Sequence, residues 1–178
     1  SRFKKDKLIV GIFGILNSHK GFDKAVEILN FKKDIELYIF SDMDVSSRRD
    51  LEYKNKLIKN MKKFRDRITV IGKLDLSNKN VVNNLINVDI GLFPYRKNAG
   101  LWNTTLRTIY DLRIPIISVN FVDKFGWDKY KRVFTINNNS KESILSAIEK
   151  LRTNISIKSK KIELRNMNNV AKDLIQII

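Results

Sequence analysis

The sequence contains no cysteine and only one histidine, His19. Without cysteine the chain has no disulfide framework and no thiolate metal site. A single imidazole rules out most histidine-rich metal sites and any nucleophile–base pair that needs a second histidine. We therefore expect neither a metal ion nor a resident cofactor, and the lack of cysteine favours a cytoplasmic protein.

Long apolar runs and flexible linkers are missing as well. No stretch of about 18 apolar residues occurs, so we expect no membrane-spanning helix. The first apolar run, Leu8–Phe13, is short and no small-residue cleavage site follows it, so it indicates a strand rather than a signal peptide. With 178 residues, 7 glycines and 2 prolines, the chain is predicted to be a single domain over residues 1–178.

Acidic residues are few relative to basic ones. The 35 lysines and arginines against 19 aspartates and glutamates give a net charge of +16, which can favour nucleic acid, an anionic membrane surface or a phosphorylated ligand. The basic residues are spread over many predicted helices and form no aromatic–basic recognition motif, so no nucleic-acid partner is predicted. A composition rich in lysine and asparagine throughout explains the charge equally well.

Short apolar runs alternate with segments of helical periodicity along the chain. The runs that predict strands are Lys7–Phe13, Ile35–Phe40, Ile68–Ile71, Ile90–Phe93, Ile114–Val119 and Arg132–Ile136. Helices are predicted after Gly21, over about 47–64, 76–88, 103–112 and 141–152, and as a last amphipathic helix over about 158–178. This alternation predicts an α/β fold: a doubly wound, Rossmann-like parallel sheet of about six strands, with helices on both faces. In the helix over 47–64, helical spacing predicts one buried apolar stripe, made of Leu51, Leu57, Ile58, Met61 and Phe64.

The segment over residues 90–120 is the first candidate for a binding site. It holds a strand, a polar loop, a helix and a second strand, which is the order of a crossover unit in a parallel sheet. Asn103 is a good helix N-cap, and Thr104 and Thr105 place two hydroxyls on the first turn. The first turn of a helix offers unpaired N–H groups to a phosphate, and ligands bind outside the carboxyl ends of parallel strands. Residues 97–108 are therefore expected to bind an anion, although ordinary helix capping explains the same pattern.

Two lysines follow predicted strands. Lys20 precedes Gly21, so its ammonium group can meet a diphosphate where the glycine lets the backbone approach closely. Lys73 follows Gly72 at the end of another strand and can face a base or a phosphate. In both cases the plain alternative is a solvated loop lysine.

Other polar and aromatic residues near these loops are weaker or secondary candidates. His19 is expected to be exposed and inert, and Asp42 is expected to cap or solvate a loop rather than hold a ribose. Tyr95 and Trp102 lie in the loop before the 103–112 helix and are better candidates for ligand contact than the strand aromatics.

Three pieces of the sequence resemble one known family. They are, in chain order, Gly14–Leu16 with Lys20–Asp23, Ile68–Lys73 with Val88–Pro94, and Gly100 with Ile114–Ser118. Their order and spacing, over about residues 7–150, resemble the C-terminal, donor-binding half of a GT-B glycosyltransferase, and most of all glycosyltransferase family 4.

The resemblance implies a function and a site. It implies the nucleotide-sugar-binding half of a retaining glycosyltransferase that transfers a sugar to a glycan or lipid-linked acceptor, with the N-terminal acceptor domain outside this chain. A lipid-linked acceptor agrees with an anionic membrane surface as a further partner. The donor diphosphate is expected at Gly14, Lys20, Lys73, Gly100, Asn103, Thr104 and Thr105, and the ribose or base at Tyr95 and Thr108. No metal is needed if these donors neutralise the diphosphate, and no residue is assigned a catalytic role.

The chain departs from the family pattern at four positions. Ile15 stands where the family usually has an arginine, and Arg113 where it usually has a glycine. The two family glutamates, eight positions apart, fall on Gly100 and Thr108. A non-catalytic, degenerate glycosyltransferase-like binding module is therefore the alternative interpretation.

Overall fold

The computed structural model describes residues 7–45, 47–100, 102–122 and 132–155. Six parallel strands form one sheet in the order β3-β2-β1-β4-β5-β6. The strands are β1 (Leu8–Phe13), β2 (Ile35–Phe40), β3 (Ile68–Val70), β4 (Ile90–Phe93), β5 (Ile116–Val119) and β6 (Val133–Ile136). The α-helices are α1 (Phe22–Glu27), α2 (Arg48–Met61), α3 (Lys79–Leu85), α4 (Thr104–Asp111) and α5 (Lys141–Ile155), and the 3-10 segments are η2 (Ser18–Lys20), η3 (Ile28–Asn30) and η4 (Lys62–Arg67). The predicted α/β class, parallel sheet and strand number are confirmed.

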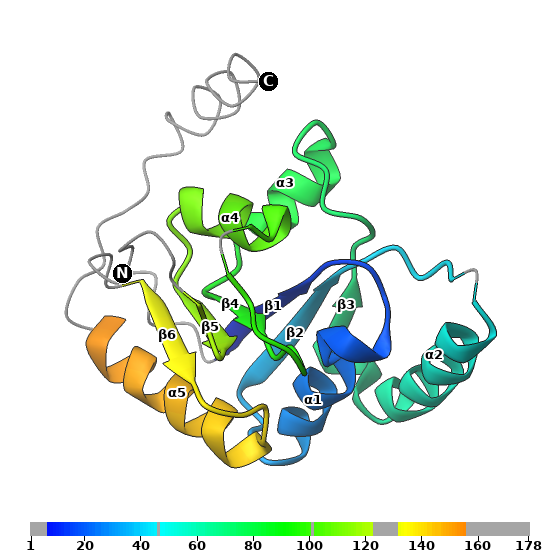
Figure 1. Ribbon diagram of the computed structural model, residues 1–178, viewed down its shortest axis with the longest axis horizontal. Coiled ribbons are helices and arrows are strands. Elements are labelled where there is room, and N and C mark those ends of the chain that lie inside the picture. Colours follow the sequence, from blue (N-terminus) through cyan, green and yellow to red (C-terminus); the bar gives the residue numbers. More distant parts are fainter. Residues whose placement is uncertain (1–6, 46, 101, 123–131, 156–178) are drawn as a thin grey trace.

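Helices cover both faces of the sheet, as Figure 1 shows. On one face α1, α2 and α5 pack on the sheet, and on the other face α3 and α4 do so. The strand order reverses between β1 and β4, because β2 and β3 extend the sheet from one side of β1 while β4, β5 and β6 extend it from the other. In a doubly wound sheet this reversal opens the loops at the carboxyl ends of the two strands, where ligands bind.

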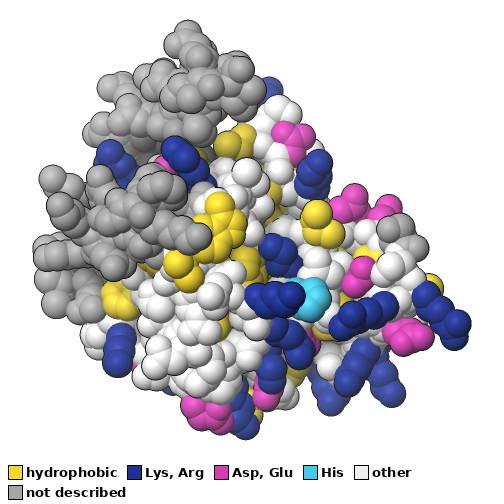
Figure 2. Space-filling model, in the orientation of Figure 1, with side chains coloured by type: hydrophobic (Ala, Val, Ile, Leu, Met, Phe, Trp, Pro, Cys, Tyr) yellow, Lys and Arg dark blue, Asp and Glu magenta, His cyan; other side chains and the backbone are white. Residues whose placement is uncertain are grey.

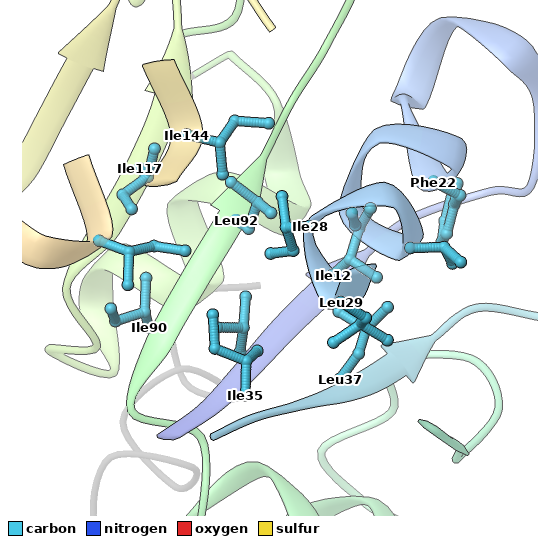
Figure 3. Packing of buried hydrophobic residues seen from close by; sticks show 14 of the residues in the cluster. Ile12, Phe22, Ile28, Leu29, Ile35, Leu37, Ile90, Leu92, Ile117 and Ile144 are labelled. Atoms are coloured by element: carbon cyan, nitrogen blue, oxygen red, sulfur yellow. The ribbon is translucent and has the colours of Figure 1, made fainter. Parts of the chain in front are cut away.

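The larger core lies under α1, α2 and α5. It is a mostly aliphatic layer in which alternate residues of the central strands, including Ile12, Leu37 and Leu92, meet helix residues such as Ile144 of α5 (Figure 3). Each of these four side chains is at most 1% exposed. Strands buried on both faces carry continuous apolar runs, which is why β1 and β4 read as unbroken hydrophobic segments.

Aromatic rings fill the other face of the central strands. Phe13 stacks on Phe40 with ring centroids 4.8 Å apart and on Phe93 with centroids 5.6 Å apart. Two glycines paired across β1 and β4 make room beside these rings. A β-carbon on Gly11 would lie 2.7 Å from Phe13 Cζ, and one on Gly91 would lie 2.9 Å from Ile109 Cγ2.

The long helix differs from its predicted form. The prediction of one helix over 47–64 is wrong at its end, because α2 stops at Met61 and a 3-10 segment with a non-helical Phe64 follows. The predicted buried stripe is wrong for Leu51, whose surface is 46% exposed, whereas Leu57 is buried. In this part of α2 the side chain that packs against the core is Tyr53, two positions after Leu51, and α2 contacts α1.

Other boundaries shift by a few residues. The helix predicted over 76–88 spans only Lys79–Leu85, and the strand predicted from Ile114 begins at Ile116. Arg113, between α4 and that strand, has a φ of 59°, a left-handed conformation that glycine adopts without strain. The helix predicted over 158–178 lies outside the described residues.

Candidate functional site

Two loops meet at the carboxyl edge of the sheet, at the point where the strand order reverses. The first follows β1 and contains η2, and the second follows β4. The Arg96 N–H donates to the His19 carbonyl at 2.9 Å, which joins the two loops directly. Gly21, with a φ of 71°, packs so tightly on the second loop that a β-carbon there would lie 2.1 Å from the Pro94 carbonyl oxygen. The Asn139 side chain donates to the same Pro94 oxygen at 3.3 Å, so the loop before α5 supports the contact.

Lys20 is the central side chain of this junction. Its Nζ lies 4.0 Å from the centroid of the Tyr95 ring, within the range of a cation–π contact. Its aliphatic stem passes over Gly14, where a β-carbon would lie 3.6 Å from Lys20 Cε and 4.0 Å from Tyr95 Oη. The side chain is half-buried, and this burial lowers the pKa of the Lys20 ammonium group.

Tyr95 links the lysine to the start of α4. Its ring is 6% exposed and meets Phe93 edge-on at 5.7 Å, so it extends the aromatic row under the sheet edge. The Asn103 side-chain amide donates to Tyr95 Oη at 3.3 Å, and burial raises the pKa of the Tyr95 hydroxyl. We call Gly14, Lys20, Tyr95 and Asn103 the lysine–tyrosine cluster.

Asn103 caps α4, as its sequence position predicted. Its Oδ1 accepts a hydrogen bond from the Leu106 N–H at 3.0 Å. The first-turn amides of a helix have no partner within the helix, and this cap takes up the one at Leu106. Thr104 and Thr105 are the first two residues of α4 and lie next to the cluster. The positive end of the helix dipole therefore lies beside Tyr95, whose ring contacts Lys20.

The remaining predicted residues lie around this cluster rather than in it. The indole ring of Trp102, which is 54% exposed, covers Gly100, where a β-carbon would lie 2.1 Å from the ring. The Thr108 hydroxyl donates to the Thr104 carbonyl at 2.9 Å, one turn along α4. Lys73 is exposed after β3, with β2 between its strand and β1. The structure thus brings four of the nine predicted residues into direct contact, with Thr104 and Thr105 adjoining them.

Basic side chains dominate the surface around the junction. Figure 2 shows lysines and arginines around the lone histidine and over the side that carries α2. His19 is exposed, as expected, and Ile15 in the same loop is 75% exposed. Asp42 accepts a hydrogen bond from the Asp44 N–H at 3.1 Å and so shapes its own loop.

The part of the chain that the structure describes contains neither a metal-binding cluster nor a helix that could span a membrane. No group of three or more His, Asp or Glu side chains there is placed to hold a metal ion. No helix there has the length and apolar content that crossing a bilayer demands.

Three residues at the junction escaped the sequence analysis as functional candidates. Asp23 in α1 binds the Arg96 guanidinium group at 2.9 Å and accepts a hydrogen bond from the Tyr53 hydroxyl at 2.8 Å. Asp23 and Arg96 are 73 positions apart, so only the folded chain shows the pair. The one sequence signal was their position, since Asp23 closely follows Lys20 and Arg96 directly follows Tyr95.

Comparisons with known proteins show which solved structures share this fold. No protein-family model matches the sequence, and no curated protein matches it. Among solved structures, the C-terminal domain of the glycosyl transferase group 1 family protein LpcC from Francisella tularensis aligns over 93% of this chain and 85% of its own, with 18% identity and a TM-score of 0.59. A glycosyltransferase from Rickettsia africae aligns over 93% of this chain and 43% of its own, with 18% identity and a TM-score of 0.64.

A third structure contains a nucleotide. Anabaena Alr3699/HepE in complex with UDP aligns over 97% of this chain and 50% of its own, with 10% identity and a TM-score of 0.63. The chain therefore spans about half the length of these two longer proteins, 43% of the Rickettsia protein and 50% of the Anabaena protein. The fold is that of the C-terminal domain of GT-B glycosyltransferases, which confirms the fold that the sequence resemblance implied.

Proposed function

We propose that this chain is the nucleotide-sugar-binding domain of a retaining glycosyltransferase that transfers a sugar to a glycan or lipid-linked acceptor. The observation that carries the proposal is the lysine–tyrosine cluster, which places a half-buried cation beside the first turn of α4 at the point where the strand order reverses. Two solved structures that share this fold come from glycosyltransferases, and a third is a complex with UDP. Acceptor binding is proposed to need a second domain beyond this chain.

The cluster has the chemistry that a diphosphate requires. Lys20 supplies a positive charge that burial disfavours in the free protein, so an anion that replaces the lost hydration stabilises the ammonium form. The amides of Thr104 and Thr105 add donors and the positive end of a helix dipole. The Tyr95 ring contacts the Lys20 ammonium group, and the Tyr95 hydroxyl accepts a hydrogen bond from Asn103. These two contacts fix the position of Lys20.

Titration with nucleotides tests the proposal. The 178-residue chain is expected to bind at least one of UDP, GDP and ADP saturably, and more tightly than the corresponding monophosphate, because the cation and the helix amides contact the diphosphate. Calorimetry measures the affinity. EDTA is expected to leave it unchanged, because Lys20 and the α4 amides neutralise the charge without a metal.

The controls separate specific binding from general attraction to a basic protein. Inorganic sulfate at the same ionic strength is expected to compete weakly, since it lacks the nucleoside and the second phosphate. A chain that binds none of the three diphosphates in saturable fashion would contradict the proposed function. Binding that EDTA abolishes would contradict the metal-free site.

A further inference from the structure

The segments over residues 19–23 and 94–96 contact each other at several points. The His19 carbonyl accepts a hydrogen bond from the Arg96 N–H, and Gly21 packs on Pro94. Between these two contacts Lys20 lies on the ring of Tyr95. The position of Lys20 therefore depends on how firmly these two segments are held together.

The Asp23 side chain adds an ion pair with Arg96 to the contact between the two segments. Its Oδ2 lies 2.9 Å from the Arg96 guanidinium group, so Arg96 binds the first segment on both sides of Lys20: by its N–H before the lysine and by its side chain after it. The Asp23 side chain is 29% exposed and that of Arg96 is 46% exposed. The pair joins one guanidinium nitrogen to one carboxylate oxygen, and a hydrogen bond between two charged groups is shorter and stronger than one between neutral groups.

Tyr53, a residue of α2, forms two hydrogen bonds with Asp23. Its hydroxyl donates to Asp23 Oδ1 at 2.8 Å and accepts from the Asp23 N–H at 3.1 Å. Burial raises the pKa of the Tyr53 hydroxyl, so it remains a proton donor at neutral pH. Both carboxylate oxygens of Asp23 thus have a partner, one from α2 and one from the loop after β4.

We infer that Asp23, held by Tyr53 and paired with Arg96, is a positioning residue that keeps Lys20 over the Tyr95 ring and so sets the affinity for the nucleoside diphosphate. The inference rests on the proposed function, because it assigns these three residues to the same site. Asp23 does not touch the ligand in this account. It acts through the two loops that carry Lys20 and Tyr95.

A double-mutant cycle with Lys20 tests the inference. The ligand is whichever of UDP, GDP and ADP binds the wild-type chain most tightly, and the affinity is measured by calorimetry. Asp23→Asn is expected to raise the dissociation constant about 5- to 20-fold in the wild-type background, as residues coupled in one network do. In the Lys20→Ala background the same change is expected to have an effect of about twofold or less, because the lysine that Asp23 positions is gone.

Two further variants keep the test informative if Asp23→Asn lowers stability. Tyr53→Phe removes one hydroxyl and is expected to weaken binding about threefold, again only when Lys20 is present. Asp66→Asn removes a negative charge whose side chain is 92% exposed in η4, and it is expected to leave affinity unchanged. Thermal unfolding of each variant confirms that the compared proteins are folded.

The outcomes separate the inference from the proposed function. An equal loss of affinity from Asp23→Asn with and without Lys20, or no loss in either background, would overturn the positioning role and leave the proposed function standing. A wild-type chain that binds no nucleoside diphosphate would overturn the proposed function and this inference with it.

Discussion

Replacing Lys20 by alanine is expected to weaken nucleoside diphosphate binding roughly 10- to 100-fold. Lys20 supplies the half-buried cation of the lysine–tyrosine cluster, and a charge-assisted hydrogen bond to an ionised group contributes about 1.5–3 kcal/mol. Calorimetric titration of both proteins measures the difference. Folding stability is expected to fall by no more than about 1 kcal/mol, the size of a partly exposed cation–π contact.

A second lysine provides the matched control for this prediction. Lys33 is exposed and precedes β2, so it lies at the opposite, amino-terminal edge of the sheet. Lys33→Ala lowers the net charge by the same amount and is expected to leave affinity within about twofold, because exposed charges far from a ligand are largely screened. Equal losses in the two variants would mean that the whole basic surface, and not the cluster, attracts the nucleotide.

The substitution Gly21→Ala is expected to lower the free energy of unfolding by roughly 3–5 kcal/mol. One part of this loss comes from the left-handed φ of 71°, which costs a residue with a β-carbon about 1–2 kcal/mol. The larger part comes from the new methyl group, which would lie 2.1 Å from the Pro94 carbonyl oxygen, a backbone atom. Urea unfolding followed by circular dichroism measures the change.

Gly72 separates the two causes. It also has a positive φ, 106°, but a β-carbon there would have no atom within 4 Å. Gly72→Ala is therefore expected to cost only the backbone strain, about 1–2 kcal/mol. If both substitutions cost the same, the close approach of Gly21 to Pro94 contributes nothing to stability, and the account of how the two loops are joined is wrong.

Local sequence features predicted much of the fold. The unbroken apolar runs of β1 and β4 identified buried strands because those strands lie between two helical layers. Asn103 identified the start of α4 because an amide side chain accepts the orphan Leu106 N–H. The positions of Lys20 and Tyr95 in loops that follow strands predicted both as site candidates.

What the sequence could not predict depends on contacts between distant segments. The stripe on the 47–64 helix included Leu51 because periodicity gives the apolar face of a helix but not the length of sheet available to cover it. The contact of Lys20 with the Tyr95 ring and the pairing of Asp23 with Arg96 arise only when β1 and β4 lie side by side.

The most direct test of the site is a nuclear magnetic resonance titration of the isotope-labelled chain with the nucleoside diphosphate that binds most tightly. The amide signals of Gly14, Lys20, Thr104 and Thr105 are predicted to shift most, and those of Gly14, Thr104 and Thr105 are predicted to shift much less in Lys20→Ala. Saturable shifts that cluster on α2 while these four amides stay unchanged would contradict a diphosphate site at the junction of the two loops.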